Sequence, residues 1–179
     1  YKGLASHGGA IGLFIAMLLY SRKVHIPFSK IIDIIAILAP LGGAFIRISN
    51  LMNSEIIGRP TDLPWAFIFR HVDNLPRHPS QLYESLSYFL IFLVAYLLYK
   101  YKGQLFKIGS YFYFGLSIFG IFFMRFLLEY TKENQKGFED SLSFNMGQLL
   151  SIPFILIGAI LVIKNVINTR KGLTNRNFL

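Results

Sequence analysis

The sequence predicts an all-α fold, a polytopic membrane helical bundle with about five transmembrane helices. Of the 179 residues, 54% are hydrophobic and 15% are charged, whereas a soluble domain is about one-quarter charged. Several apolar runs approach the roughly 20 residues that a helix needs to cross a bilayer. The basic residues, which give a net charge of +9, lie between these runs and form no stripe or arm. This pattern excludes a disordered chain, argues against a simple soluble domain and predicts no nucleic-acid partner.

The apolar segments divide the chain into five expected helices. The first is short and Gly-rich, and the connection over residues 52–81 contains four prolines, so it cannot form one continuous helix. Trp65, followed by Phe67–Phe69, predicts a piece of this connection at the membrane interface, where aromatic rings are enriched. We expect a single integral membrane domain over residues 1–179. The expected helices are Leu4–Tyr20, Ile31–Leu51, Leu82–Tyr99, Ile108–Tyr130 and Leu149–Val166.

The charges between the helices predict their orientation. Residues 21–30 and 100–107 each carry a net charge of +3, and the C-terminal segment from Lys164 carries +4. By contrast, residues 52–81 sum to zero and residues 131–145 to −1. Because cytoplasmic loops are enriched in Lys and Arg, we expect the C-terminal tail to be cytoplasmic. The two neutral connections then face outward, together with His7 at the head of the first helix.

Two arginines stand deep in the expected helices. Arg47 lies 16 residues after Ile31 and Arg125 lies 17 residues after Ile108, which places both about 25 Å from the cytoplasmic side. A single Arg near a helix end can snorkel to the interface. Two at one depth favour a shared anionic ligand, because burying each costs about 2.5 kcal/mol or more and a guanidinium binds phosphate through two parallel hydrogen bonds. We expect both to face one outward-opening cavity.

Polar residues continue from Arg47 toward the outer end of its helix. Asn50 and Asn53 follow at intervals of three, hence on roughly one face, and Glu55 and Gly58 come next. Such a stripe lines either a cavity or an exposed helix terminus. The depth of Arg47 favours the cavity.

Two carboxylates have simpler expected roles. Glu129 follows Arg125 by four residues, a spacing that predicts an ion pair which either orients or neutralises the guanidinium. Asp33 lies just inside the cytoplasmic end of its helix. We expect it to cap a helix or to pair with a nearby lysine.

His7 is a weaker candidate for catalysis. It heads the first apolar segment and is followed by Gly8 and Gly9, which leave the adjacent backbone unshielded. An imidazole with an ordinary pKa near 6.5 suits proton transfer, although a lone His is more often structural. No metal site is predicted, since the chain has no cysteine and its other histidines show no ligand spacing with carboxylates.

Five blocks of specific residues follow one another along the chain. They are Ser6–Gly12, Arg47–Arg59, Pro76–Glu84, the Arg125 and Glu129 pair, and Met146–Gln148 together with Ser151–Pro153. In this order they resemble bacterial prolipoprotein diacylglyceryl transferases. The second block matches the family's signature, with its Arg, two Asn, Glu and Gly in register, and the third matches nearly residue for residue.

The resemblance implies a reaction that fits the arginines. The family moves the diacylglyceryl group of phosphatidylglycerol onto the lipobox cysteine thiol of a prolipoprotein, forming a thioether and releasing glycerol phosphate. It implies a multi-pass protein of the bacterial inner membrane, with the site facing the outer leaflet and no cofactor. The partners would be phosphatidylglycerol, the signal peptide of the prolipoprotein and membrane lipids. It also implies an N-terminal portion with further helices, which this sequence lacks.

The resemblance also implies roles for individual residues. His7 would be the base that removes the thiol proton, and Arg47 and Arg125 would stabilise charge on the departing phosphate. Phosphatidylglycerol would be bound by the two arginines and by Asn50, Asn53, Glu55, Gly58 and Glu129. We expect the 76–84 block to be mainly architectural, with Ser80 as the N-cap of the third helix and Arg77 paired within its loop or touching the lipid headgroup.

Some positions depart from the family pattern. Phe45 and Ile46 stand where a small residue is usual before the signature Arg, and Ser49 and Leu51 replace a small residue and a Phe. Ile121 stands where the family often has Tyr, so no role of that Tyr carries over. Two other interpretations of paired intramembrane arginines remain: an anion transporter or channel, and a scaffolding membrane protein whose arginines snorkel.

Overall fold

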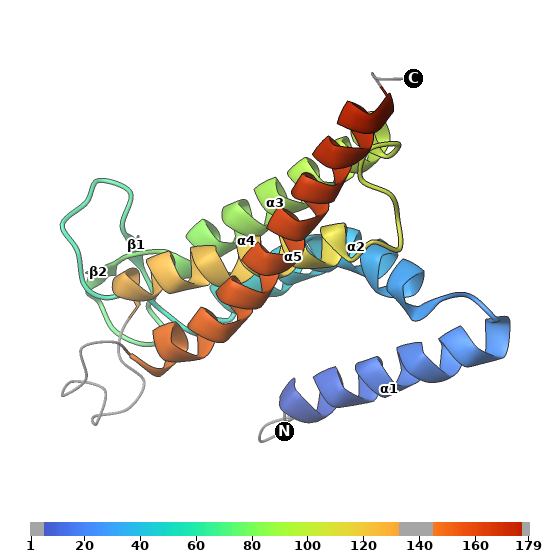
Figure 1. Ribbon diagram of the computed structural model, residues 1–179. Coiled ribbons are helices and arrows are strands. Elements are labelled where there is room, and N and C mark those ends of the chain that lie inside the picture. Colours follow the sequence, from blue (N-terminus) through green and yellow to red (C-terminus); the bar gives the residue numbers. More distant parts are fainter. Residues whose placement is uncertain (1–5, 133–144, 177–179) are drawn as a thin grey trace.

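The computed structural model describes residues 6–132 and 145–176 and contains five α-helices in that part of the chain. Figure 1 shows α2 to α5 gathered in a bundle, with α1 set apart from it and joined through the turn to α2. A short 3-10 turn, η1, continues α4. The elements are α1 (Ser6–Val24), α2 (Phe28–Met52), β1 (Phe67–Ile68), β2 (Pro76–Arg77), α3 (Ser80–Lys102), α4 (Phe112–Leu128), η1 (Glu129–Thr131) and α5 (Met146–Arg176).

The predicted helical membrane bundle is confirmed. Four helices of the described part are long and apolar enough to cross a membrane, namely α2, α3, α4 with η1, and α5. The first expected segment also forms a helix, α1, which is not among these four. The chain is therefore a multi-pass membrane protein. Helix α1 contacts the bundle through α2, where the rings of Phe14 and Phe28 meet edge to face at 5.3 Å.

The connection between α2 and α3 is not helical, as its prolines predicted. Strands β1 and β2 pair antiparallel, with Phe67 opposite Arg77, and Pro60 forms a further bridge to Arg77. Trp65 is 55% exposed, and its indole N–H donates to the Tyr83 hydroxyl at 2.8 Å. An exposed ring with a bonded N–H suits a membrane interface, and that location stays a prediction.

The interior of the bundle is apolar at one end and polar at the other. The apolar core, Ile37, Ala95, Phe112 and Tyr113, lies toward the α3–α4 connection. Buried polar side chains gather at the opposite end, beside the long connection. Polar and ionisable groups inside a membrane bundle are energetically costly and mark functional sites. This end of the bundle is therefore the candidate functional site. The buried polar residues at this end are Arg77, Ser80, Gln81, Glu84, Ser85, Lys132, Gln148 and Ser151.

Asp33 acts as a cap, one of the two roles expected for it, but for a different helix from its own. Its fully buried carboxylate accepts backbone N–H bonds from Gly109 at 2.9 Å, Tyr111 at 3.0 Å and Phe114 at 3.0 Å. Gly109 and Tyr111 have φ angles of +98° and +63°, in the left-handed region that L-residues rarely adopt. Asp33 therefore fixes the turn that starts α4 from across the bundle.

Two glycines let α4 and α5 approach closely. A Cβ at Gly158 would lie 2.6 Å from the backbone nitrogen of Phe119 and 2.8 Å from the carbonyl oxygen of Gly115. A Cβ at Gly115 would lie 2.6 Å from Cβ of Leu161. Small residues at such a contact are typical of helix packing in membranes. This contact sets where α4, which carries Arg125, sits against α5.

Replacing Gly158 by alanine should destabilise the bundle. The added methyl group meets backbone atoms that cannot move aside, so we expect a loss of about 1–3 kcal/mol in unfolding free energy. Gly42→Ala is the matched control, because a Cβ there meets nothing within 4 Å. Unfolding of both variants in detergent, followed by circular dichroism, checks this. Equal stability of the Gly158 and Gly42 variants would contradict the close packing of α4 on α5.

Candidate active site at the polar end of the bundle

Four charged residues form a continuous ion-pair chain, Arg47–Glu84–Lys132–Glu129. Nε of Arg47 lies 2.9 Å from Oε2 of Glu84, whose Oε1 accepts a hydrogen bond from Nζ of Lys132 at 2.9 Å. The same Nζ donates to Oε2 of Glu129 at 3.0 Å. Glu84 is fully buried, and the side chains of Lys132 and Arg47 are 5% and 15% exposed. With two positive and two negative members, the chain is neutral as a whole.

The ion-pair chain ties the spanning helices of the bundle together. Arg47 comes from α2, Glu84 from the first turns of α3, and Glu129 and Lys132 from η1 and the residue after it. Helix α5 meets it at Gly147, where a Cβ would lie 2.5 Å from Oε1 of Glu129. Charged side chains from α2, α3 and the end of α4 are thus held in one place by their own pairing.

The expected ion pair between Arg125 and Glu129 does not form. Glu129 bonds Lys132 instead. The physical reason is the change from α-helix to 3-10 turn after Leu128, which alters the i,i+4 geometry and brings the side chain three residues further on against the carboxylate.

Among the residues that the structure describes, Arg125 has no counter-ion. It is partly buried in α4, and within residues 6–132 and 145–176 the structure gives its guanidinium no hydrogen bond or ion pair. An unpaired guanidinium in a membrane-spanning helix is energetically unfavourable. Arg125 is therefore a candidate site for an anion from outside the chain.

Tyr88 lies near both arginines. It is a buried residue of α3, close enough to Glu84, Arg47 and Arg125 for their charges to act on its hydroxyl. Its ring packs where Gly43 of α2 has no side chain, since a Cβ there would lie 3.1 Å from Cδ2 of the ring. Arg47 and Arg125 thus belong to one electrostatic neighbourhood around Tyr88. That they face one shared cavity stays a prediction.

Arg47 and Arg125 do not lie at the equal distances from the starts of their helices that the sequence predicted. Helix α2 starts at Phe28 and helix α4 at Phe112, earlier and later than expected. Counted from the C-terminal ends, Arg47 lies five residues before the end of α2 and Arg125 three before the end of α4. These separations are about 8 Å and about 5 Å along the helix axes. Both arginines are therefore near the C-terminal ends of their helices.

The polar stripe after Arg47 is a hydrogen-bonded relay. Nη1 of Arg47 donates to Oδ1 of Asn50 at 3.2 Å, and Nδ2 of Asn50 donates to Oε2 of Glu55 at 2.7 Å. Asn53 ends α2 as its C-cap residue, and its side chain and that of Glu55 are exposed. Arg47, Asn50 and Glu55 are thus brought together, and Asn53 lies beside them.

Gly58 allows its backbone to lie directly against residues 78–80. A Cβ there would overlap the carbonyl oxygen of His78 and lie 2.6 Å from Oγ of Ser80. Its own carbonyl accepts a hydrogen bond from Nη1 of Arg77 at 3.0 Å. The preceding backbone is strained, because Ile56, a β-branched residue, has φ of +54°. Gln81 holds this turn by donating to the carbonyl of Glu55 at 2.6 Å.

The 76–84 block contains residues that hold the fold together and one buried charge, Glu84. Ser80 is the first residue of α3 and makes no side-chain cap bond to that helix, so the predicted N-cap is wrong. Its hydroxyl donates instead to the carbonyl of Thr131 at 3.1 Å and ties α3 to η1. Arg77 pairs with Asp73 in the same loop, as predicted. Glu84, the last residue of the block, is the centre of the ion-pair chain.

Hydrogen bonds from Arg77 lower the pKa of Asp73 below its ordinary value. The carboxylate therefore stabilises the loop above the unfolded pKa, and that contribution is lost as pH falls through the lower, folded value. We expect the protection of the β1–β2 hairpin amides, measured relative to their intrinsic exchange rates, to fall below about pH 4. Asp73→Asn should exchange faster at neutral pH and show a flatter profile. An unchanged profile in that variant would show that the pair does not hold the loop.

Sequence reasoning did not single out Glu84, Lys132, Gln81 or Tyr88. Glu84 carried a usable signal, since a carboxylate four residues into an apolar helix needs a counter-ion. In the sequence, Lys132 contributes only a charge to the outer connection. Its partner Glu84 is 48 residues away, a separation over which the sequence gives no pairing rule.

The side chain of His7 lies outside the described residues, although its backbone belongs to α1. A Cβ at Gly8 or Gly9 would meet no described atom within 4 Å, which fits the unshielded backbone expected beside it. The role of His7 stays a prediction.

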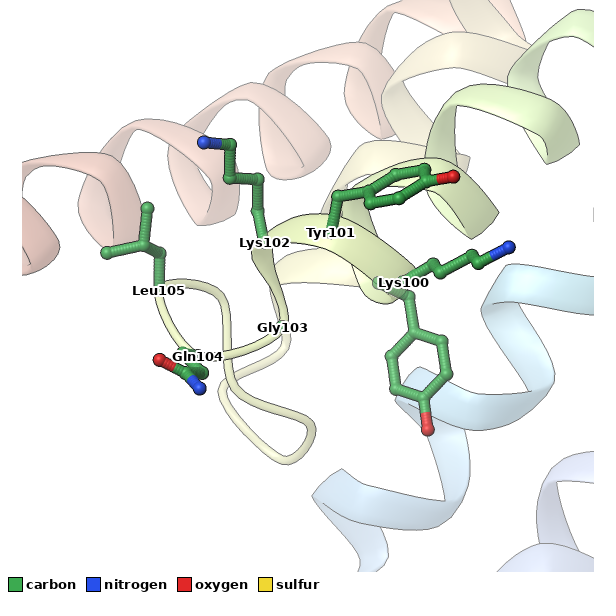
Figure 2. A pocket seen from close by; sticks show the side chains of 7 residues that line it. Lys100, Tyr101, Lys102, Gly103, Gln104 and Leu105 are labelled. Carbon is green, nitrogen blue, oxygen red and sulfur yellow. The ribbon is translucent and has the colours of Figure 1, made fainter.

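Two of the surface cavities lie at opposite ends of the bundle. One of about 630 Å³ is lined by Tyr99–Leu105, at the far end of α3 from Glu84, and Figure 2 shows its Lys100 and Lys102 side chains pointing in different directions. The other, about 670 Å³, is largely apolar and lies between the end of α2, at Leu51 and Met52, and residues 66–71. The second begins immediately after Asn50, so the polar site has an apolar hollow beside it.

Comparison with known proteins identifies a family. The profile of the prolipoprotein diacylglyceryl transferase family matches residues 1–164. Curated relatives named phosphatidylglycerol–prolipoprotein diacylglyceryl transferase include one from Bacteroides fragilis, 52% identical over 88% of this chain and 56% of the relative. Those from Chloroherpeton thalassium and Tolumonas auensis are 45% and 44% identical, over 93% and 90% of this chain, and each is covered over 62% of its length.

The chain thus spans about three-fifths of the length of these relatives. The match nevertheless includes all the residues of the site, from His7 through the ion-pair chain to Gly147. A helical membrane bundle with two arginines near the C-terminal ends of their helices, and a profile that covers nearly the whole sequence, lead to one assignment. The chain belongs to the prolipoprotein diacylglyceryl transferase family.

Proposed function

We propose that this chain transfers the diacylglyceryl group of phosphatidylglycerol to the lipobox cysteine thiol of prolipoproteins. The observation that carries the proposal is Arg125, a guanidinium with no counter-ion among the described residues, in the same electrostatic neighbourhood as Arg47. The phosphodiester of phosphatidylglycerol has one negative charge and sits at the headgroup boundary. It would supply a counter-charge for Arg125, which the ion-pair chain, being neutral as a whole, does not.

The charge changes of the reaction explain the need for two arginines. The thiolate sulfur attacks the glyceryl carbon of the lipid, an S–C bond forms, and the C–O bond to phosphate breaks with its electron pair going to oxygen. The departing group changes from a phosphodiester monoanion to a phosphate monoester of nearly two negative charges. Arg125 and Arg47 would stabilise the charge that develops on this oxygen, the form of assistance that enzymes use most.

A proton must also leave the thiol. A cysteine thiol has an ordinary pKa near 8.5 and reacts as the thiolate. His7 is the base we propose, because it stands at the head of an apolar helix on the side predicted to face outward. Asn50, Asn53, Glu55, Gly58 and Glu129 would complete the phosphatidylglycerol site, with the site open to the outer leaflet and the C-terminal tail in the cytoplasm.

The test uses the protein reconstituted in vesicles of phosphatidylglycerol labelled in its acyl chains, with a peptide that contains a lipobox cysteine. We expect label on the peptide and one glycerol phosphate released per modified peptide. Phosphatidylcholine vesicles should give no product. Anion flux without a covalent product would favour a transporter and overturn the proposal, and neither flux nor product would favour a scaffold.

A further inference from the structure

We infer that Glu84 is the positioning residue of Arg47 in the transfer reaction, an inference that rests on the proposed function. Its carboxylate is fully buried and is shared between Arg47 and Lys132, each at 2.9 Å. Glu84 comes from α3, whereas Arg47 comes from α2. The contact therefore fixes the guanidinium with respect to a helix other than its own.

Arg47 is held at two of its three nitrogen atoms. Nε lies 2.9 Å from Oε2 of Glu84, and Nη1 donates to Oδ1 of Asn50 at 3.2 Å. Oε2 has no aligned hydrogen bond among the described residues, so Glu84 acts on Arg47 through charge. A guanidinium held by a carboxylate charge on one side and by a hydrogen-bond acceptor on the other has a defined position, which is what a group that must meet charge developing on one oxygen requires.

The pattern of pairing separates this role from simple neutralisation. Lys132 has two carboxylate partners, Glu84 and Glu129. Arg47 has one ion-pair partner in the described part of the chain, Glu84. Removing the charge of Glu84 leaves Lys132 still paired with Glu129, whereas Arg47 loses its counter-ion. The expected consequence therefore falls on Arg47 rather than on the fold.

Glu84→Gln tests the inference, with Ser85→Ala as the matched control. Ser85 is buried beside Glu84 in the sequence and joins the same two helices by donating to the carbonyl of Ala44 at 3.0 Å. Among the described residues its hydroxyl makes no hydrogen bond to Arg47. We expect Glu84→Gln to lower kcat roughly 10²-fold, the scale of a group misplaced by about 1 Å. KM for phosphatidylglycerol should change little, because Arg125 still holds the phosphate. Ser85→Ala should keep the wild-type kcat.

A second variant guards against a failure to fold. Glu84→Gln with Lys132→Gln removes one charge of each sign and keeps the cluster balanced. We expect this double variant to fold and to stay slow. A double variant or a folded Glu84→Gln variant with wild-type kcat would overturn the inference while leaving the transfer reaction intact. Wild-type protein that forms no product would instead contradict the proposed function itself.

Discussion

Replacing Arg125 by alanine should lower kcat/KM for diacylglyceryl transfer by about 10²–10³-fold, the scale of losing one preorganised donor to a developing oxyanion. The guanidinium has no protein counter-ion among the described residues, so its removal leaves no buried carboxylate unpaired. The fold should therefore be retained. Turnover with labelled phosphatidylglycerol and thermal unfolding, measured on the same preparation, separate the two effects.

Arg22→Ala is the control for Arg125, because Arg22 is an exposed arginine in the last turn of α1. Arg125→Lys and Arg47→Lys should recover activity only in part, since an ammonium cannot present the planar fork of a guanidinium. Near-normal turnover in Arg125→Ala would show that the unpaired cation is not the phosphate site.

Replacing His7 by alanine should slow transfer by about 10²–10⁴-fold, the usual value of general-base assistance. Binding of phosphatidylglycerol should stay close to that of the wild-type protein. The base acts as the neutral imidazole, so the wild-type rate should fall as pH drops through the histidine pKa, ordinarily near 6.5. A pH–rate profile of both proteins measures this, and the inflection should vanish in the variant.

His7→Gln separates a base from a hydrogen-bonding group. Glutamine keeps donors and an acceptor but cannot take the proton. If that variant turns over normally with an unchanged pH profile, His7 positions lipid or peptide and the base is another group.

The fold class could be predicted from the sequence, and so could the end of the bundle where the candidate site lies, because both depend on local properties. Apolar length, prolines and loop charges each act within a short stretch of chain. Arg47 and Arg125 were found for the same reason, since a cation in an apolar helix is visible without knowing its neighbours. Asp33 was expected to cap a helix or to pair with a lysine, and it does act as a cap. The backbone N–H groups that it accepts from, those of Gly109 and Tyr111, are 76 and 78 residues away, so this partner could not be predicted.

The partners of the arginines could not be found in this way. The i,i+4 spacing predicted that Glu129 would pair with Arg125. Because the helix changes to a 3-10 turn at Glu129, this carboxylate pairs with Lys132 instead. The counter-ion of Arg47 comes from α3, in a block whose prolines suggested architecture. Ser80 was misassigned as an N-cap because its true partner, Thr131, is 51 residues away.

The most direct test of the account is the mass of the peptide after reaction. High-resolution mass spectrometry of a lipobox peptide, incubated with the protein and phosphatidylglycerol of one defined acyl composition, shows which bond breaks. Cleavage of the C–O bond predicts a cysteine that gains the diacylglyceryl group and no phosphorus, in a thioether that resists thiol exchange. A phosphorus-containing adduct, or an unmodified peptide in the presence of lipid-bound protein, would contradict it.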